Sequence, residues 1–180
     1  MTIGSGAPPK TGWAKLVPEL LVSDIAASIE FWCGRLGFAI AYQRPEESFA
    51  YLERPEGAQI MLSQRSGKWE IAPLDRPYGR GAMFQVYVAS VEPVQRSLEA
   101  AGWPLYAGPR EVWREIGDRQ AGQQEIFVLD PDGIRLFSCK TRQSASPSTQ
   151  RQHSQSDCRS LTRSNTSGSG FDHPTVAPGQ

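Results

Sequence analysis

The first regular pattern of apolar and polar residues is a short apolar run followed by a helical repeat. Residues 16–22 are mostly apolar, which predicts a short strand. Apolar side chains then recur at spacings of four, three and four residues, so they share one face of a helix. These side chains are Ile25, Ile29, Trp32 and Leu36. Ser23 or Asp24 can accept a hydrogen bond at the helix start, and Gly37 suits its end.

Short apolar segments separated by turns follow this helix and complete a first module, residues 16–63. They predict strands at residues 38–43, 48–53 and 58–63. The first module therefore has the order β-α-β-β-β. A connector, residues 64–81, is rich in Gly and Pro, which is typical of a loop. Its aromatic residues, Trp69 and Tyr78, either pack locally or form part of a lid.

The strand–helix unit occurs a second time. Residues 82–89 predict a strand, and Ser90 can cap a helix with a regular apolar face. That face consists of Val91, Val94, Leu98 and Ala101. Asp24 corresponds to Ser90 and Gly37 to Gly102, so the unit is an internal repeat. Further strands are predicted at residues 105–107, 111–116, 124–129 and 134–139, which gives a second module over residues 82–140.

The two ends of the chain differ from the repeated modules. Residues 1–14 are expected to form a flexible lead-in. Residues 144–180 are rich in Ser, Thr, Gln and Arg, and they contain too few large apolar side chains to offset the entropy of ordering. We therefore expect a disordered tail there and one α+β domain over residues 15–143.

Composition narrows the possible partners. The formal net charge is zero, so nothing favours a nucleic acid or an anionic membrane. No apolar run is long enough for a membrane helix, and residues 1–15 lack a signal pattern. The three cysteines, Cys33, Cys139 and Cys158, have no metal-binding spacing. Cys33 and Cys139 are expected to be buried, which favours a reducing, cytoplasmic setting.

Several motifs resemble one known family. They are V-S-D-I-x-x-S-I-E-F-W at residues 22–32, L-G-F at 36–38 and G-Q-Q-E-I-F-V-L-D-P-D-G at 122–133. With the repeat, they resemble the vicinal oxygen chelate superfamily of glyoxalases, extradiol dioxygenases, fosfomycin resistance enzymes and bleomycin resistance proteins. V-P-E-L-L-V-S-D at 17–24 and W-R-E-I-G at 113–117 are most similar to the bleomycin-resistance branch.

This resemblance implies a fold and an assembly. It implies the glyoxalase/bleomycin resistance fold, in which two βαβββ modules form a cup-shaped sheet around a ligand. It also implies a homodimer, joined edge to edge or by strand swapping, with the ligand near the subunit boundary.

The resemblance also implies four positions for metal ligands in the metal-dependent relatives. Here these positions hold Val17, Met61, Met83 and Phe137, and none is a His or a carboxylate. Both histidines, His153 and His173, lie in the predicted tail. We therefore expect no metal, no other cofactor and no catalytic residue, although a carboxylate site that includes Glu19 remains conceivable. Cys33 has no His partner within the domain and is not expected to be a nucleophile.

Strand alternation predicts which side chains face the cup. The predicted inward positions are Val17, Glu19, Leu21, Phe49, Tyr51, Glu53, Gln59, Met61, Ser63, Met83, Gln85, Tyr87, Phe127, Arg135, Phe137 and Cys139. The candidate ligand-binding residues are Glu19, Tyr51, Met61, Gln85, Tyr87, Trp113, Glu115 and Phe137. Glu19 interrupts an apolar strand, so it either answers a cationic ligand or pairs with Arg114 or Arg135.

The sequence thus predicts a metal-free, homodimeric binding protein of the bleomycin-resistance type. It would confer antibiotic resistance by sequestering an aromatic or cationic compound such as a glycopeptide antibiotic. One alternative is a metal-dependent lyase or oxidoreductase of the glyoxalase or dioxygenase type with unusual ligands. Others are a metal-free isomerase with Glu19 as base, or an interaction module whose cup is filled by its own side chains.

Overall fold

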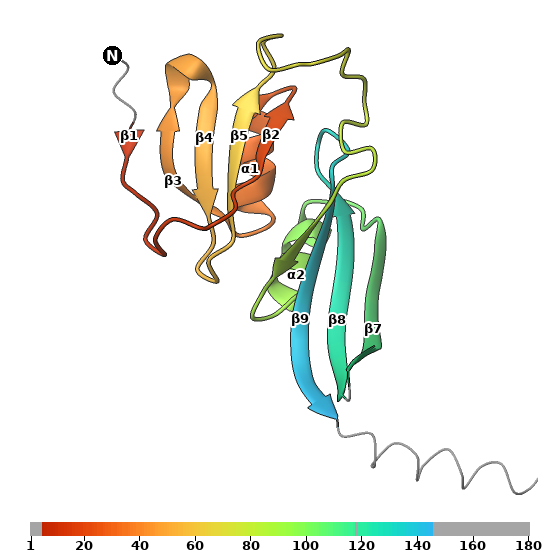
Figure 1. Cartoon of the computed structure of the whole chain (residues 1–180). Helices are drawn as coiled ribbons and strands as arrows, with labels where there is room; N and C mark the ends of the chain where they lie inside the picture. The colour runs from red at the N-terminus through yellow and green to blue at the C-terminus, as the bar shows by residue number, and fades with distance from the viewer. Residues whose placement is uncertain (1–4, 118, 146–180) are drawn as a thin grey trace, which may run out of the picture. The chain divides into compact units, whose positions relative to one another are not determined.

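The computed structural model describes residues 5–117 and 119–145, so the predicted tail from residue 146 on lies outside the described residues. Figure 1 shows two sheets, each with one helix. The strands are β1 (Ser5–Gly6), β2 (Glu19–Val22), β3 (Ala39–Arg44), β4 (Phe49–Glu53), β5 (Gln59–Gln64), β6 (Met83–Tyr87), β7 (Ala107–Ile116), β8 (Arg119–Leu129) and β9 (Arg135–Ala145). The helices are α1 (Ile25–Gly34), η1 (Pro45–Glu47) and α2 (Glu92–Ala100). No helix of the described residues is long and apolar enough to cross a membrane.

The two sheets repeat one strand arrangement, as predicted. The first sheet has the order β1-β3-β4-β5-β2, and the second has the order β6-β9-β8-β7. In each module the first strand pairs in parallel with the last, β2 with β5 and β6 with β9. The other strands of each module pair antiparallel. The chain is therefore an α+β fold of two βαβββ modules, and this prediction is confirmed.

Local signals set both helices. Asp24 caps α1, because its side chain accepts a hydrogen bond from the backbone N–H of Ala27 at 3.0 Å. The helix ends before Gly37, which has a φ of +72° that glycine tolerates best. The N-cap of α2 is Val91, which makes no side-chain capping bond, so the predicted cap Ser90 lies one residue early; its hydroxyl oxygen accepts a hydrogen bond from the N–H of Glu92 at 3.3 Å. Both predicted helix starts are thus within two residues of the observed ones.

The hydrophobic core lies between the helices and one face of each sheet. Side chains from both modules form one buried cluster, which includes Phe31 and Trp32 of α1 and Leu98 of α2. The positions predicted to face the helices belong to it or pack against it: Leu52, Ile60, Leu62, Phe84, Val86, Val88, Ile126, Val128 and Leu136. This confirms the predicted alternation. The opposite face of each sheet, here called its open face, carries the remaining side chains.

The D-P-D-G turn at residues 130–133 joins both modules. Asp130 Oδ1 accepts hydrogen bonds from the backbone N–H groups of Asp132 and Ile134, at 3.0 and 2.8 Å. Asp132 is 1% exposed, accepts from the N–H of Ser23 at 2.9 Å and pairs with Arg76 at 2.8 Å. The two aspartates of this family motif therefore have structural partners.

Residues before β2 lie against the first sheet. The strand β1 pairs with β3, and Glu53 accepts hydrogen bonds from the N–H groups of Lys10 and Thr11 at 3.1 and 3.3 Å. The N–H of Ala14 donates to Gln59 Oε1 at 2.9 Å. Residues 5–14, expected to be a flexible lead-in, thus contact the sheet.

The largest departures from the predicted elements are in the second sheet. Strands were predicted at residues 105–107 and 111–116. The structure has one strand there, β7, which begins at Ala107 and has a register shift between Ala107 and Arg110. The partner strand β8 begins at Arg119, earlier than predicted, because it pairs with the whole of β7. The strand β9 runs to Ala145, past the predicted domain end at residue 143, because β8 extends to meet it.

Candidate functional site

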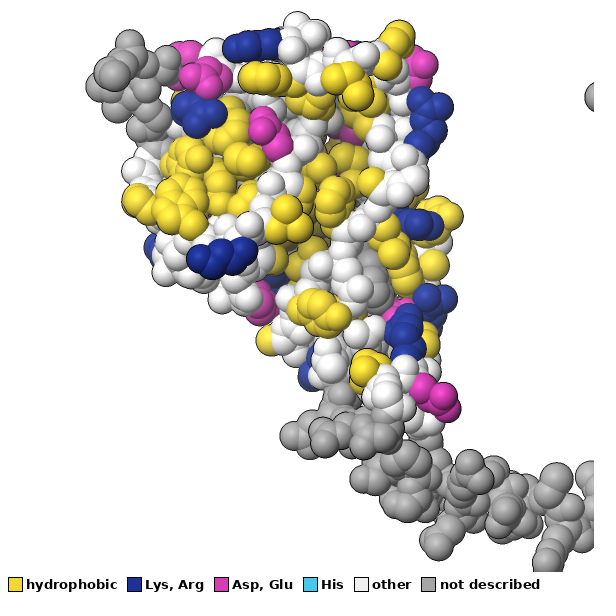
Figure 2. Space-filling view, viewed as in Figure 1, with side chains coloured by type: hydrophobic (Ala, Val, Ile, Leu, Met, Phe, Trp, Pro, Cys, Tyr) yellow, Lys and Arg dark blue, Asp and Glu magenta, His cyan; other side chains and the backbone are white. Residues whose placement is uncertain are grey.

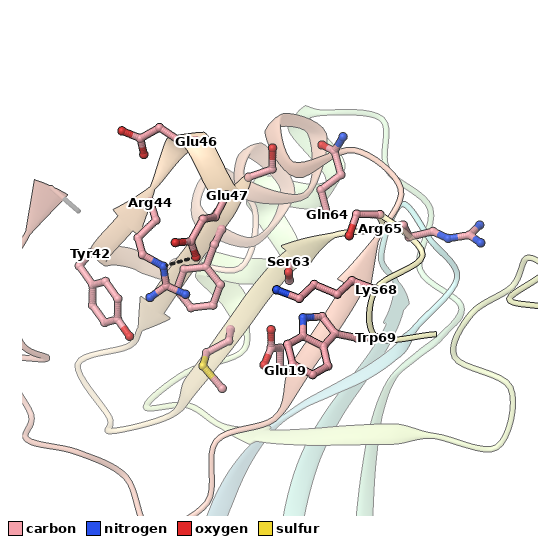
Figure 3. Close-up of a pocket in the computed structure, with 14 residues that line it drawn as sticks. Glu19, Tyr42, Arg44, Glu46, Glu47, Ser63, Gln64, Arg65, Lys68 and Trp69 are labelled. Atoms are coloured by element: carbon pink, nitrogen blue, oxygen red, sulfur yellow. Dashed lines mark hydrogen bonds and ion pairs between the residues drawn. The ribbon is translucent and has the colours of Figure 1, made fainter. Parts of the chain in front are cut away.

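The open face of the first sheet carries a cavity of about 740 Å³, here called the first cavity. Strands β2, β3, β4 and β5 form its floor, and the segment after β5 forms one side (Figure 3). It is lined by Glu19, Tyr42, Arg44, Glu46, Glu47, Ser48, Phe49, Met61, Ser63, Gln64, Arg65, Ser66, Lys68 and Trp69. Its size is within the usual range for small-molecule sites. Figure 2 shows hydrophobic side chains gathered over this sheet with charged ones at the margin.

Half of the six charged side chains that line the first cavity form ion pairs within the protein. The Nε of Arg44 donates to Glu47 at 2.7 Å, and its guanidinium lies 3.8 Å from the centre of the Phe49 ring. Arg65 donates two hydrogen bonds to Glu70, at 3.0 and 2.6 Å, and extends away from the cavity (Figure 3).

Glu19, Lys68 and Trp69 lie together at one side of the first cavity (Figure 3). Figure 3 shows the carboxylate of Glu19 beside the Trp69 ring, with Lys68 above them. The ammonium of Lys68 lies 5.3 Å from the centre of the Trp69 ring. In the part of the chain that the structure describes, no hydrogen bond or ion pair engages the carboxylate of Glu19. Glu19 is exposed, whereas the sequence predicted a buried carboxylate. It can therefore meet the positive charge of a ligand.

The open face of the second sheet carries a second cavity, of about 490 Å³. It is lined by Met83, Gln85, Tyr87, Arg110, Arg114, Gln123, Phe127 and Arg135. Glu125 lies beneath two of these arginines and is fully buried. It pairs with Arg110 at 2.8 Å and with Arg114 at 2.5 Å. The predicted pairing of Glu19 with Arg114 or Arg135 is absent among the described ion pairs.

The thiol of Cys139 lies beside this ion pair. Cys139 is buried, and the side-chain amide of Gln85 donates to its Sγ at 3.2 Å. Burial raises the pKa of the Cys139 thiol above its ordinary value, and the nearby Glu125 carboxylate raises it further. Burial likewise raises the pKa of Cys33. Both thiols are therefore poor nucleophiles at neutral pH.

The structure divides the predicted site residues among three places. Glu19 and Met61 line the first cavity, and Gln85 and Tyr87 line the second. Tyr51 is 3% exposed, and its hydroxyl donates to Gln59 Oε1 at 2.6 Å. The ring of Trp13 covers it edge-on, with ring centres 5.5 Å apart.

Two further predicted residues, Trp113 and Glu115, do not line either cavity. Trp113 and Glu115 alternate along β7 with Arg114, so they belong to the other face of the sheet. The Trp113 indole N–H donates to Glu111 at 3.1 Å. The backbone of Phe137 pairs with Gln85 and Phe127, but its side chain lies outside the described residues.

A metal of the kind used by the family's enzymes does not fit these side chains. The corresponding positions hold Val17, Met61 and Met83, and their donor atoms are two thioethers, which do not suit hard cations or zinc. Among residues 5–117 and 119–145, no group of three His, Cys, Asp or Glu side chains is placed to hold an ion. We therefore derive no step through a metal.

Comparison with known proteins identifies the family. A sequence model of the "Glyoxalase/Bleomycin resistance protein/Dioxygenase superfamily" matches residues 15–136. The chain belongs to this superfamily. A superfamily member from Vibrio splendidus 12B01 is 31% identical over 70% of this chain and 97% of its own, with a TM-score of 0.30. No curated protein matches the chain.

Other solved structures of the superfamily's fold resemble this chain more distantly in sequence. A virulence protein from Salmonella typhimurium is 22% identical over 71% of this chain and 97% of its own, with a TM-score of 0.52. TioX from Micromonospora sp. ML1 is 15% identical over 71% of this chain and 98% of its own, also with a TM-score of 0.52. At these identities the likeness concerns the fold alone.

Proposed function

We propose that this protein is a metal-free binding protein that sequesters a small aromatic cation, as expected of the bleomycin-resistance branch. The observation that carries the proposal is the exposed, unpaired carboxylate of Glu19 beside the ring of Trp69 in the first cavity. A flat cation would place its ring against Trp69 and its charge near Glu19. Stacking, burial of apolar surface and charge complementarity would together supply the affinity.

The cavities and the side chains at the metal positions favour binding over two of the alternatives, the filled cup and the metal-dependent enzyme. A filled cup would leave no space, whereas the two cavities measure about 740 and 490 Å³. A metal-dependent lyase or oxidoreductase needs hard or borderline donors at the cup positions, and thioethers occupy two of them. The proposed action is therefore retention of the ligand without turnover.

A second copy of the chain is the proposed partner. Each cavity is lined by one module, the first also by residues that follow β5, and each lies on the open face of its own sheet. In the family's cup, two such faces close around one ligand. We propose that a homodimer supplies the facing half, which sedimentation of the full chain with and without ligand would test.

The binding test uses two probes of the same shape and different charge. Isothermal titration calorimetry would compare (2-naphthylmethyl)ammonium with neutral 2-naphthalenemethanol, for the wild-type protein and for Glu19→Gln. A hydrogen bond to a charged group is worth roughly 1.5–3 kcal/mol, so the variant should lose at least about ten-fold affinity for the cation. Its affinity for the neutral probe should change less than about two-fold, since the stacking surface remains.

Controls and a drug ligand complete the test. Glu99→Gln removes an exposed carboxylate from α2, outside both cavities, and should leave both affinities unchanged. Bleomycin at about one hundred times its dissociation constant should raise the free energy of unfolding by about 2.7 kcal/mol. Equal losses for both probes in Glu19→Gln, or no binding of either probe, would overturn the proposal.

A further inference from the structure

The second cavity has an excess of positive charge. Three arginines line it, Arg110, Arg114 and Arg135, and one buried carboxylate, Glu125, lies among them. The first cavity differs, because there Arg44 and Arg65 each have a glutamate partner of their own. One glutamate cannot neutralise three guanidinium groups, so the second cavity suits a ligand that brings negative charge.

Glu125 holds two of the arginines in place. Its Oε2 meets the Nε of Arg110 at 2.8 Å, and its Oε1 meets a terminal nitrogen of Arg114 at 2.5 Å. Another terminal nitrogen of Arg114 donates to Gln123 at 2.7 Å. Each guanidinium has five N–H donors, so both keep donors beyond these contacts. The arginine side chains are 51% and 44% exposed, whereas Glu125 is fully buried.

The third arginine has a buried donor without a partner. The Nε of Arg135 is buried and makes no hydrogen bond to the described residues. Its guanidinium lies 5.9 Å from the centre of the Tyr106 ring, and no described carboxylate pairs with it. The guanidinium also has terminal N–H groups, which can donate to a ligand oxygen. Arg135 therefore lines this cavity with a positive charge that no described carboxylate offsets.

The rest of the lining is apolar or neutral. Met83 and Tyr87 are 46% and 55% exposed, and Phe127 lies beneath the Arg110 guanidinium, 4.8 Å from ring centre to carbon. These side chains offer a surface for a ring. We propose that the second cavity binds a small organic anion, with its carboxylate or phosphate on the three arginines and its apolar part against Tyr87 and Met83.

This inference goes beyond the proposed function, since it concerns another sheet and the opposite charge. The test titrates the full chain with 2-naphthoate, 2-naphthyl phosphate, neutral 2-naphthamide and inorganic phosphate. Naphthoate or naphthyl phosphate should bind at least about ten-fold more tightly than the amide, because charge-assisted hydrogen bonds to arginine are lost with the charge. The tighter of the two anions identifies which acid group the site accepts.

The discriminating variant is Arg135→Met, which removes one arginine without leaving a buried carboxylate unpaired. It should weaken the preferred anion by about ten-fold or more and leave the amide unchanged. Arg135→Lys should give an intermediate loss, because a lysine keeps the charge without the planar fork. Arg96→Met, on the exposed surface of α2, is the matched control and should change nothing. Equal binding of amide and anions, or wild-type anion affinity in Arg135→Met, would overturn the proposal.

Discussion

The two sheets share one strand arrangement and carry opposite chemistry on their open faces. On the first sheet, the carboxylate of Glu19, which no described residue pairs with, lies beside the Trp69 ring (Figure 3). On the second, three arginines line the cavity, and two of them, Arg110 and Arg114, pair with the buried carboxylate of Glu125. The repeat is maintained by helix caps, turn glycines and core-facing apolar positions, and these leave the open face free to diverge. A duplicated module can thus supply two different half-sites.

The two faces also differ in what covers them. Residues 5–14 lie against the first sheet, where Trp13 contacts both Tyr42 and Tyr51 edge-on. On the second sheet, Tyr87 and Met83 remain about half exposed. These differences between the faces predict effects of different size.

The largest expected effect concerns the ion pairs. Arg110→Met with Arg114→Met would leave Glu125 buried and unpaired, which should lower the free energy of unfolding by about 3–5 kcal/mol. Arg44→Met on the first sheet breaks an exposed pair and should cost about 1 kcal/mol or less. Urea unfolding measures both. Similar losses at the two sites would contradict the contrast between buried and exposed pairs.

The next effect is a pH dependence of opposite sign in the two modules. Burial raises the pKa of Asp130 from 3.8 to about 6, so the native state binds more protons than the unfolded state between those values. Its contribution to stability is therefore full below pH 3.8 and falls by about 3 kcal/mol in all as the pH rises through about 6. Asp130→Asn keeps an oxygen acceptor for the turn and should remove this fall.

Glu53 behaves in the opposite way. Burial alone would raise its pKa, but hydrogen bonds from the backbone N–H groups of Lys10 and Thr11 outweigh that effect and lower it. Glu53 therefore stabilises the folded state above the pKa that it has in the unfolded state. This stabilisation is lost as the pH falls through the pKa that it has in the folded state. Glu53→Gln should therefore flatten the acid side of the stability curve. Urea unfolding from pH 3 to 7 measures the free energy of unfolding of both variants. If both variants changed the stability in the same part of this pH range, the pair of predictions would be wrong.

The smallest expected change in stability concerns Trp13, which packs on the first sheet. Trp13→Ala removes two edge-on ring contacts and should lower the free energy of unfolding by about 1 kcal/mol. Burial is the main reason that the pKa of Tyr51 is raised, so uncovering the ring should lower that pKa towards its ordinary value. Absorbance titration of the phenolate measures it. An unchanged tyrosine titration would show that Trp13 does not shield Tyr51.

The sequence predicted the parts of the fold that depend on local signals. Asp24 caps α1 as expected, and the positions predicted to face the helices are in the core. The sequence did not predict the lengths of strands that depend on pairing between strands. The long hairpin of β7 and β8 carries many polar residues, so no apolar alternation marks its length. Its extent follows from backbone pairing, which sequence patterns do not record.

The candidate site was only partly predictable, for similar reasons. Glu19 and Tyr87 follow from alternation in regular strands. Tyr42 was missed because the register of β3 shifts between Ile40 and Tyr42, which breaks alternation. Trp69 lines the first cavity from a connector without periodicity. Glu125 could have been found, since it is two residues from Phe127 on the same strand and so shares its face.

We propose that the two open faces select ligands of opposite charge. The most direct measurement is a crossed calorimetric titration of (2-naphthylmethyl)ammonium and 2-naphthoate into Glu19→Gln and Arg135→Met. We predict that Glu19→Gln loses about ten-fold affinity for the cation alone, and that Arg135→Met loses as much for the anion alone. If each variant weakened both probes equally, the two faces would not be chemically distinct sites, and the account would be wrong.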